Sequence, residues 1–374
     1  MDLRFSDEQL MLADTIESIC EQFYGLERIR QKRSADDSCP QEFWQALVNA
    51  GFSGLVIDEE FGGAGLGLLD AVSVFQALGR HLASSPLLVS SLLAARAIDI
   101  LASSTQRRQW LPAIASGDCV VSVAQLEAGC GYGSSSFITT LKKGKLNGEK
   151  ILVPHASLAT HLLVLATDED NEMPVCCLVD TRQSSLQVSP QDNIACAEVS
   201  RVTMVDVAVE SECIVYNDQF WSLWQSAMSY SAVAAAAECN GGAQAMLSMT
   251  VEYANNRIQF GKPIGAFQSL SHYMAELATE LEGSKTLNHQ AAWAFDQGRD
   301  WHLLAAQSKL QAGDGFRRTT AVGTQIHGGL GFTREANPQL FFRHAKLQQL
   351  LMWDPCFLEQ HIASLMLDTR TETQ

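Results

Sequence analysis

The first 118 residues carry apolar side chains at intervals of three to four positions, as in Leu10, Ala13 and Ile16. This spacing places apolar side chains on one face of an α-helix, and its recurrence predicts a bundle of short amphipathic helices. Ser6 followed by Gln9 has the form of a capping box, which predicts that the first helix begins there.

The pattern changes after residue 118. Short β-prone runs, such as 161–166 and 175–179, alternate with polar turns. Asn147 and Gly148 form a pair that is typical of a tight hairpin turn. These features predict a small β-domain.

Helical periodicity returns in the last part of the chain, over four long stretches: 229–257, 270–294, 303–322 and 338–366. Their many small residues predict a close-packed four-helix bundle. The predicted fold is therefore mainly α with a central β-domain. We expect an N-terminal helical domain over 1–118, a β-domain over 119–215 and a C-terminal helical bundle over 216–374.

Composition narrows the choice of partner. The formal net charge of -16 leaves no basic footprint for nucleic acid or an anionic membrane surface, so a small molecule or a protein is the expected partner. The ten cysteines include no CxxC unit, which argues against a zinc site or a disulfide framework. The polar N-terminus and the lack of a long apolar stretch lead us to expect a cytoplasmic protein.

A polar and glycine-bearing segment, 257–268, joins the first two predicted C-terminal helices. Arg257 and Gln268 at such a junction suit a phosphate and an adenine edge. The alternative is structural: Arg257 caps a helix, Phe260 fills the core and Gly261 turns the chain.

A second glycine-rich junction follows the third predicted helix and contains Gln325, Gly328, Gly329 and Gly331. Its backbone can approach a ligand closely. No strand precedes it, so it is not a dinucleotide-binding fingerprint. By itself it is also consistent with a simple helix-ending turn.

Together with the acidic and glycine-rich segment 58–66, and arranged around a central β-domain, these segments resemble the acyl-CoA dehydrogenase family over nearly the whole chain. The resemblance implies FAD as cofactor, acyl-CoA as substrate and an electron-transfer flavoprotein or similar acceptor. It also implies an oligomer, because each flavin of the family lies across a subunit interface. The residues that it places at the adenosine and pyrophosphate part of the flavin are Arg257, Phe260, Gln268, Gln325, Gly328, Gly329 and Gly331.

The sequence departs from this family at the catalytic base. The family's usual glutamate falls at Met352, and its alternative position falls near Ser231. A thioether cannot act as a base. Asp354 and Glu238 remain as candidate bases; the alternatives are that Asp354 caps a helix before Pro355 and that Glu238 is a buried structural carboxylate.

The segment expected at the flavin ring also departs from the family. Only a fragment of the polar ring loop survives in 124–133, and Pro154 offers neither an amide hydrogen nor a hydroxyl group. This pattern resembles small subunits of two-component acyl-CoA dehydrogenases, which work with a glutamate-bearing homologue. A homo-oligomer with an atypical base, a different flavin chemistry and a catalytically inactive scaffold subunit remain as alternatives.

Overall fold

The computed structural model describes residues 4–31, 39–133, 137–195 and 197–367. These residues divide into two compact units. The helical unit holds the described residues of 1–32, 67–83 and 232–374, and the β unit holds those of 33–66 and 84–231. The division of the chain into three domains stays a prediction.

The helical unit begins with short amphipathic helices, as the sequence predicts. They are α1 (Asp7–Phe23), α2 (Leu26–Gln31) and α4 (Leu68–Arg80). The predicted capping box is present: the Ser6 hydroxyl accepts the Gln9 amide, and the Gln9 side chain accepts the Ser6 amide. These two bonds satisfy donors that a helix start otherwise leaves unpaired.

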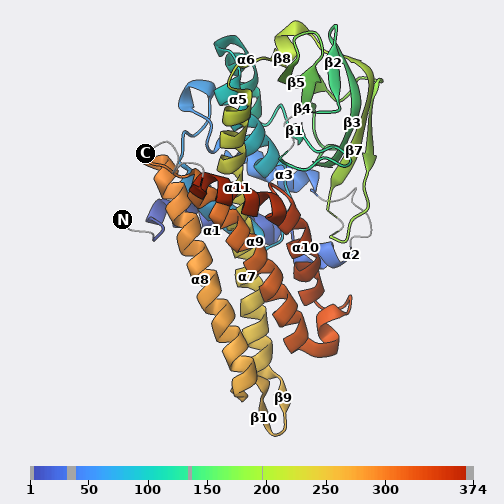
Figure 1. Ribbon diagram of the computed structural model, residues 1–374. Helices are drawn as coiled ribbons and strands as arrows, with labels where there is room; N and C mark the ends of the chain where they lie inside the picture. The colour runs from blue at the N-terminus through green and yellow to red at the C-terminus, as the bar shows by residue number, and fades with distance from the viewer. Residues whose placement is uncertain (1–3, 32–38, 134–136, 196, 368–374) are drawn as a thin grey trace. The chain divides into compact units, whose positions relative to one another are not determined.

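Long helices follow in the same unit (Figure 1), beginning with the part of α7 (Phe220–Asn256) that starts at Ala232. The others are α8 (Gln268–Asp296), α9 (His302–His327), α10 (Pro338–Leu350) and α11 (Pro355–Leu367). The predicted C-terminal bundle is confirmed. The last predicted stretch is two helices, because the chain turns sharply between α10 and α11.

Small residues allow α4 and α7 to pack closely. A Cβ atom on Gly241 of α7 would collide with the carbonyl of Gln76 on α4, so the two backbones are in direct contact there. Further along, Ala236, Ala243, Phe316 and Phe341 belong to one buried core cluster that joins α7, α9 and α10.

The β unit contains α3 (Gln41–Asn49), α5 (Ala95–Leu101), α6 (Ser104–Ala115) and one sheet of mixed direction. The strand order is β6-β7-β3-β2-β4-β5-β8, and β1 pairs with β4 in parallel. The strands are β1 (Val121–Ala124), β2 (Thr140–Lys142), β3 (Lys145–Pro154), β4 (His161–Asp168), β5 (Met173–Asp180), β6 (Leu186–Pro190), β7 (Val199–Ala208) and β8 (Ile214–Val215).

The predicted hairpin turn at Asn147-Gly148 is wrong. Both residues lie inside β3, where Gly148 sits at an irregularity in the pairing of β3 with β7. The chain turns instead at Lys143 and Gly144, whose φ values of 49° and 70° suit a two-residue hairpin loop. Gly148 is required for another reason, because a Cβ atom there would press against Thr139.

Among the helices of the described residues, none is both long and apolar enough to span a lipid bilayer.

Candidate cofactor and active site

The two glycine-bearing junctions lie side by side in the helical unit. The ring of Tyr253, near the end of α7, stacks on the ring of His327 at the end of α9, with centroids 4.4 Å apart. The Nδ1 of His327 lies 2.8 Å from the Gly323 carbonyl, to which it donates. Burial lowers the pKa of His327, so the ring is neutral near pH 7. This neutral stack fixes the ends of α7 and α9 against each other.

The first junction is an exposed β-hairpin. Strands β9 (Ile258–Gln259) and β10 (Lys262–Pro263) pair in antiparallel fashion around Phe260 and Gly261, whose φ values of 51° and 80° form the turn. The Phe260 side chain does not fill the core, because it is 92% exposed.

The side chains of Arg257 and Gln268, the candidate ligands of the first junction, are open to solvent. Arg257 follows the last turn of α7, and Gln268 is the first residue of α8. The guanidinium of Arg257 can therefore meet a phosphate without breaking any packing inside the chain.

The glycines of the second junction have two different roles: one is required by packing inside the chain, and the others leave backbone uncovered. A Cβ atom on Gly331 would collide with the Thr324 carbonyl, so this glycine is required by packing. A Cβ atom on Gly329 would meet no described atom within 4 Å. Gly328 has φ 61° and ψ -136°, which side chains other than glycine rarely adopt. The exposed Gln325 precedes this bare stretch of backbone.

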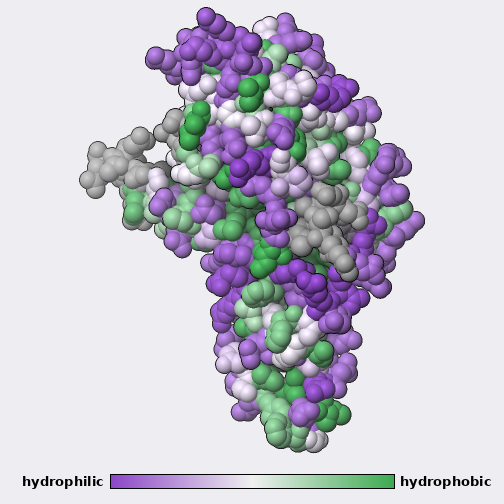
Figure 2. All heavy atoms as spheres, turned by 90° about the vertical axis from the view of Figure 1, so that its right-hand side faces the viewer, coloured by the Kyte–Doolittle hydropathy of each residue, from purple (hydrophilic) through white to green (hydrophobic). Residues whose placement is uncertain are grey.

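Apolar side chains surround these junctions. Figure 2 shows green side chains gathered at its lower end, where the β9–β10 hairpin of Figure 1 lies. Ile258 is 62% exposed, and on the neighbouring 3-10 helix η7 (Gly328–Phe332) Leu330 and Phe332 are exposed as well. A bare glycine backbone, an arginine and uncovered apolar side chains together fit the nucleotide end of FAD covered by a second subunit.

The turn between α10 and α11 contains the expected position of the base. Met352 and Trp353 are buried, and both have left-handed backbone, with φ 51° and 77°. One oxygen of Asp354 accepts the backbone amides of Cys356 at 2.9 Å and Phe357 at 3.1 Å. Asp354 therefore caps α11, which begins with Pro355.

Glu238 is also engaged. It lies buried on α7, and its Oε1 accepts a hydrogen bond of 2.8 Å from the side chain of Gln348. The ring of His344 lies 3.9 Å from the same oxygen. The backbone carbonyl of Gln348 accepts from the buried Lys309, whose pKa is lowered by burial despite the charge of Glu238 nearby. At the family's alternative base position, the Ser231 hydroxyl donates to the Ala227 carbonyl of its own helix.

The segment expected at the flavin ring follows β1 in the β unit. Glu127 and Lys150, which sequence analysis does not single out as a pair, form a buried ion pair of 2.8 Å there. Leu152 has a positive φ of 52°, and its amide donates to the side chain of Gln191. Pro154 has no amide hydrogen, and its carbonyl accepts from Ser122.

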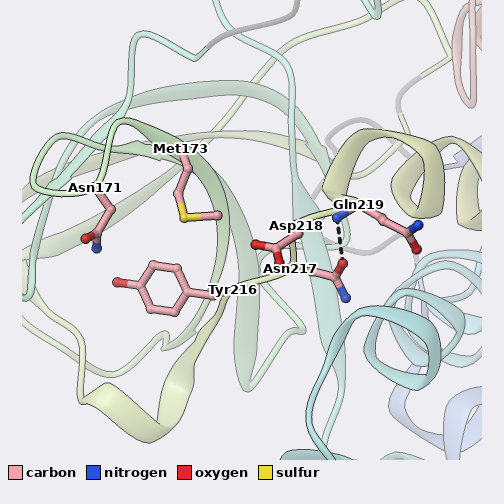
Figure 3. A pocket seen from close by; sticks show the side chains of 6 residues that line it. All are labelled: Asn171, Met173, Tyr216, Asn217, Asp218 and Gln219. Carbon is pink, nitrogen blue, oxygen red and sulfur yellow. Dashed lines mark hydrogen bonds between the residues drawn. The ribbon is translucent and has the colours of Figure 1, made fainter.

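A separate hollow of about 840 Å³ lies on the β unit (Figure 3). Its lining residues are Asn171, Met173, Tyr216, Asn217, Asp218 and Gln219. The Tyr216 hydroxyl and the Asn171 amide both donate to the buried Asp168, and burial together with Asp168 raises the pKa of Tyr216 to about 12. The polar groups of Tyr216 and Asn171 are thus engaged with Asp168, and we assign no chemistry to the hollow.

Comparison with known proteins identifies the family. Two family models match the chain: the acyl-CoA dehydrogenase N-terminal domain over residues 6–118 and the acyl-CoA dehydrogenase C-terminal domain over residues 221–352. The chain belongs to the acyl-CoA dehydrogenase family. It is therefore a flavoprotein oxidoreductase of the acyl-CoA dehydrogenase type, with FAD as its cofactor.

Similar proteins match over almost the full length of this acyl-CoA dehydrogenase family member. Acyl-CoA dehydrogenase IpdE2 of Mycobacterium tuberculosis is 28% identical over 93% of the chain and 94% of its own length. Acryloyl-CoA reductase (NADH) of Anaerotignum propionicum is 26% identical over 94% of the chain and 92% of its own length.

Solved structures share the fold. Butyryl-CoA dehydrogenase of Megasphaera elsdenii gives a TM-score of 0.91 at 22% identity, covering 98% of this chain and 100% of that one. A chain of the ChsE4-ChsE5 complex of Mycobacterium tuberculosis gives 0.86 at 24% identity, covering 98% and 99%. The mainly helical fold with a β-domain is thereby confirmed.

Proposed function

We propose that the chain is one subunit of a two-component acyl-CoA dehydrogenase, which introduces a double bond between the α and β carbons of an acyl-CoA thioester. In this reaction a carboxylate removes the α proton, and FAD, when bound, would supply the acceptor for the hydride of the β carbon. The carboxylate belongs to a homologous partner subunit. This chain supplies contacts to the nucleotide end of the flavin.

The observation that carries this proposal is the chemistry of the α10–α11 turn. Met352 occupies the base position, and the two nearby carboxylates are already engaged, Asp354 as a helix cap and Glu238 with Gln348. A general base must reach the proton that it removes, whereas Asp354 is bound to two backbone amides and Glu238 is buried against Gln348. The nucleotide-side residues other than the buried Gly331, in contrast, are exposed at the two junctions.

The uncovered apolar surface supports an arrangement between subunits. Phe260 and Ile258 project from the hairpin with most of their surface in water. Burial of a large apolar side chain contributes about 1.5–3 kcal/mol, so these residues favour association with a second chain. A protein of the same fold has been solved as the complex of ChsE4 with ChsE5, which supports a hetero-oligomer.

The chain's own groups have defined tasks in this proposal. Arg257 binds the pyrophosphate, and the bare backbone at Gly328 and Gly329 allows the nucleotide to approach. Gln268 and Gln325 offer amide groups to the adenine and ribose edges. An electron-transfer flavoprotein or similar acceptor takes up the electrons, and we place the reaction in the cytoplasm.

The test is to purify the chain alone and together with a glutamate-bearing homologue. We expect oxidised flavin in the absorbance spectrum of the pair, and bleaching of that spectrum by acyl-CoA. The chain alone should not reduce an electron acceptor with acyl-CoA. Turnover by the chain alone would contradict the assignment of the catalytic base to the partner subunit. A subunit pair that contains no flavin would contradict the proposal as a whole.

A further inference from the structure

A buried ion pair in the β unit connects the two stretches of chain that flank residues 128–133. Glu127 is 3% exposed and Lys150 is 0% exposed, and their charged atoms lie 2.8 Å apart. Burying two charges costs several kcal/mol per ion before their attraction is counted. Such a pair is stable only where further hydrogen bonds satisfy both charged groups. The partners in those bonds therefore show which parts of the chain the pair connects.

Glu127 binds the backbone of residues 138 and 139. One carboxylate oxygen accepts the amide of Ile138 at 2.6 Å, and the other accepts the amide of Thr139 at 2.8 Å. Burial alone would raise the pKa of Glu127, but the bonds from Lys150, Thr139 and Ile138 outweigh it and lower this pKa. Glu127 is therefore an ionised carboxylate that ties the two sides of the segment together.

Lys150 holds the stretch that precedes residues 128–133. Its ammonium group donates to Glu127 and to the Gln125 carbonyl at 3.2 Å, and it lies 4.6 Å from the ring centre of Phe137. One residue further along β3, the amide of Ile151 donates to the Leu126 carbonyl at 2.9 Å. Three successive residues after β1 are thus fixed by β3.

We propose that Glu127 and Lys150 are positioning residues that fix the flavin-ring loop of this subunit by fastening residues 125–127 to residues 138–139. This inference rests on the proposed function, and it adds that the segment after β1, which the family resemblance places at the flavin ring, faces the ring side of a flavin. The family's usual polar side chains are largely missing from this segment, so its backbone must make the contacts. Backbone groups serve as preorganised donors only where the chain is held in place.

The first experiment measures amide hydrogen exchange of residues 124–133 in the purified chain. Glu127→Gln and Lys150→Met each leave one buried charge without its partner, and each should speed exchange about tenfold or more. The double variant removes both charges, so the fold should recover its thermal stability while the segment still exchanges faster than in the wild type. Glu169→Gln combined with Lys142→Met is the matched control, because that pair of the same unit is exposed.

The second experiment compares the flavin of the subunit pair in wild type and in the double variant. We expect unchanged flavin content, since the nucleotide end is bound elsewhere, and a shifted absorbance band and reduction potential of the ring. A double variant that matches the wild type in both exchange and ring spectrum overturns the positioning role, while the proposed function stands. If the wild-type subunit pair contains no flavin, the proposed function is wrong. The exchange data then test only whether Glu127 and Lys150 hold residues 125–127 against residues 138–139.

Discussion

Asp354 lies two residues beyond the base position, and its local contacts decide what it can do. One of its oxygens accepts two amides at the start of α11, which leaves the group committed to a helix end. Met352 beside it is buried and has no proton acceptor of useful strength. The sequence already carried both signals, since Asp before Pro is typical of a helix start.

Two substitutions at Asp354 separate capping from catalysis. Asp354→Ala should lower the free energy of unfolding by about 1 kcal/mol, because the cap is lost. Asp354→Asn keeps an oxygen that can cap, so both thermal stability and the acyl-CoA-dependent rate of the subunit pair should stay close to wild type. A fall in that rate of about a hundredfold or more in the Asn variant would instead identify Asp354 as the base.

The glycines of the second junction give a graded test of the nucleotide site. Gly331→Ala should lower the free energy of unfolding by about 1–3 kcal/mol, because the new methyl group meets the Thr324 carbonyl. Gly329→Ala should change stability by less than about 0.5 kcal/mol, since nothing in the described chain lies nearby. Its expected effect is a lower flavin content of the subunit pair, measured by absorbance. Normal flavin content in a folded Gly329→Ala pair would contradict a nucleotide at this backbone.

At the scale of elements, periodicity predicts the long helices well and local pairs predict turns poorly. The 3.6-residue pattern locates α8 and α9 because their apolar faces are long enough to average out exceptions. The Asn147-Gly148 pair misleads, because pairing with β7 on both sides of the bulge outweighs a two-residue signal. The β9–β10 hairpin has strands of two residues each, too short for any alternation to appear.

The candidate site shows the same limit. The combination of motifs predicts the nucleotide-side residues. No sequence spacing predicts the ion pair of Glu127 with Lys150, because only the folded sheet brings these two residues together. The ion pair forms only if the side chain of Lys150 points inward from β3. The irregularities in the pairing of β3 with β7 shift the register and so change which residues of β3 point inward. A lysine amid inward-facing apolar positions is the one signal that the sequence offers.

The hairpin itself makes a prediction about assembly. Phe260→Ser should leave the thermal stability of the isolated chain within about 0.5 kcal/mol of wild type, because the ring is already in water. The dissociation constant of the subunit pair should rise about tenfold or more, measured by analytical ultracentrifugation. Ile194→Ser, an exposed apolar residue of the β unit, is the control and should leave the constant unchanged. Equal effects of both variants would show that the hairpin is not part of the interface.

For the whole molecule, charge and exposed apolar surface act in opposite directions. The net charge of -16 repels a second copy of the same chain, while the hairpin side chains favour contact with some other surface. In the proposed pair, a homologue with fewer acidic residues would experience less of that repulsion. Both terms are consistent with the mixed pair that we propose.

The uncovered hairpin also affects how much of this chain a cell can tolerate. A copy without its partner exposes Phe260 of the hairpin, and Leu330 and Phe332 of the neighbouring η7, to water. Exposed apolar surface of this kind promotes aggregation and recognition by chaperones and proteases. Production of both subunits in equal amounts, for instance from one transcript, would allow the partner to cover the hairpin and η7 as soon as the chain folds.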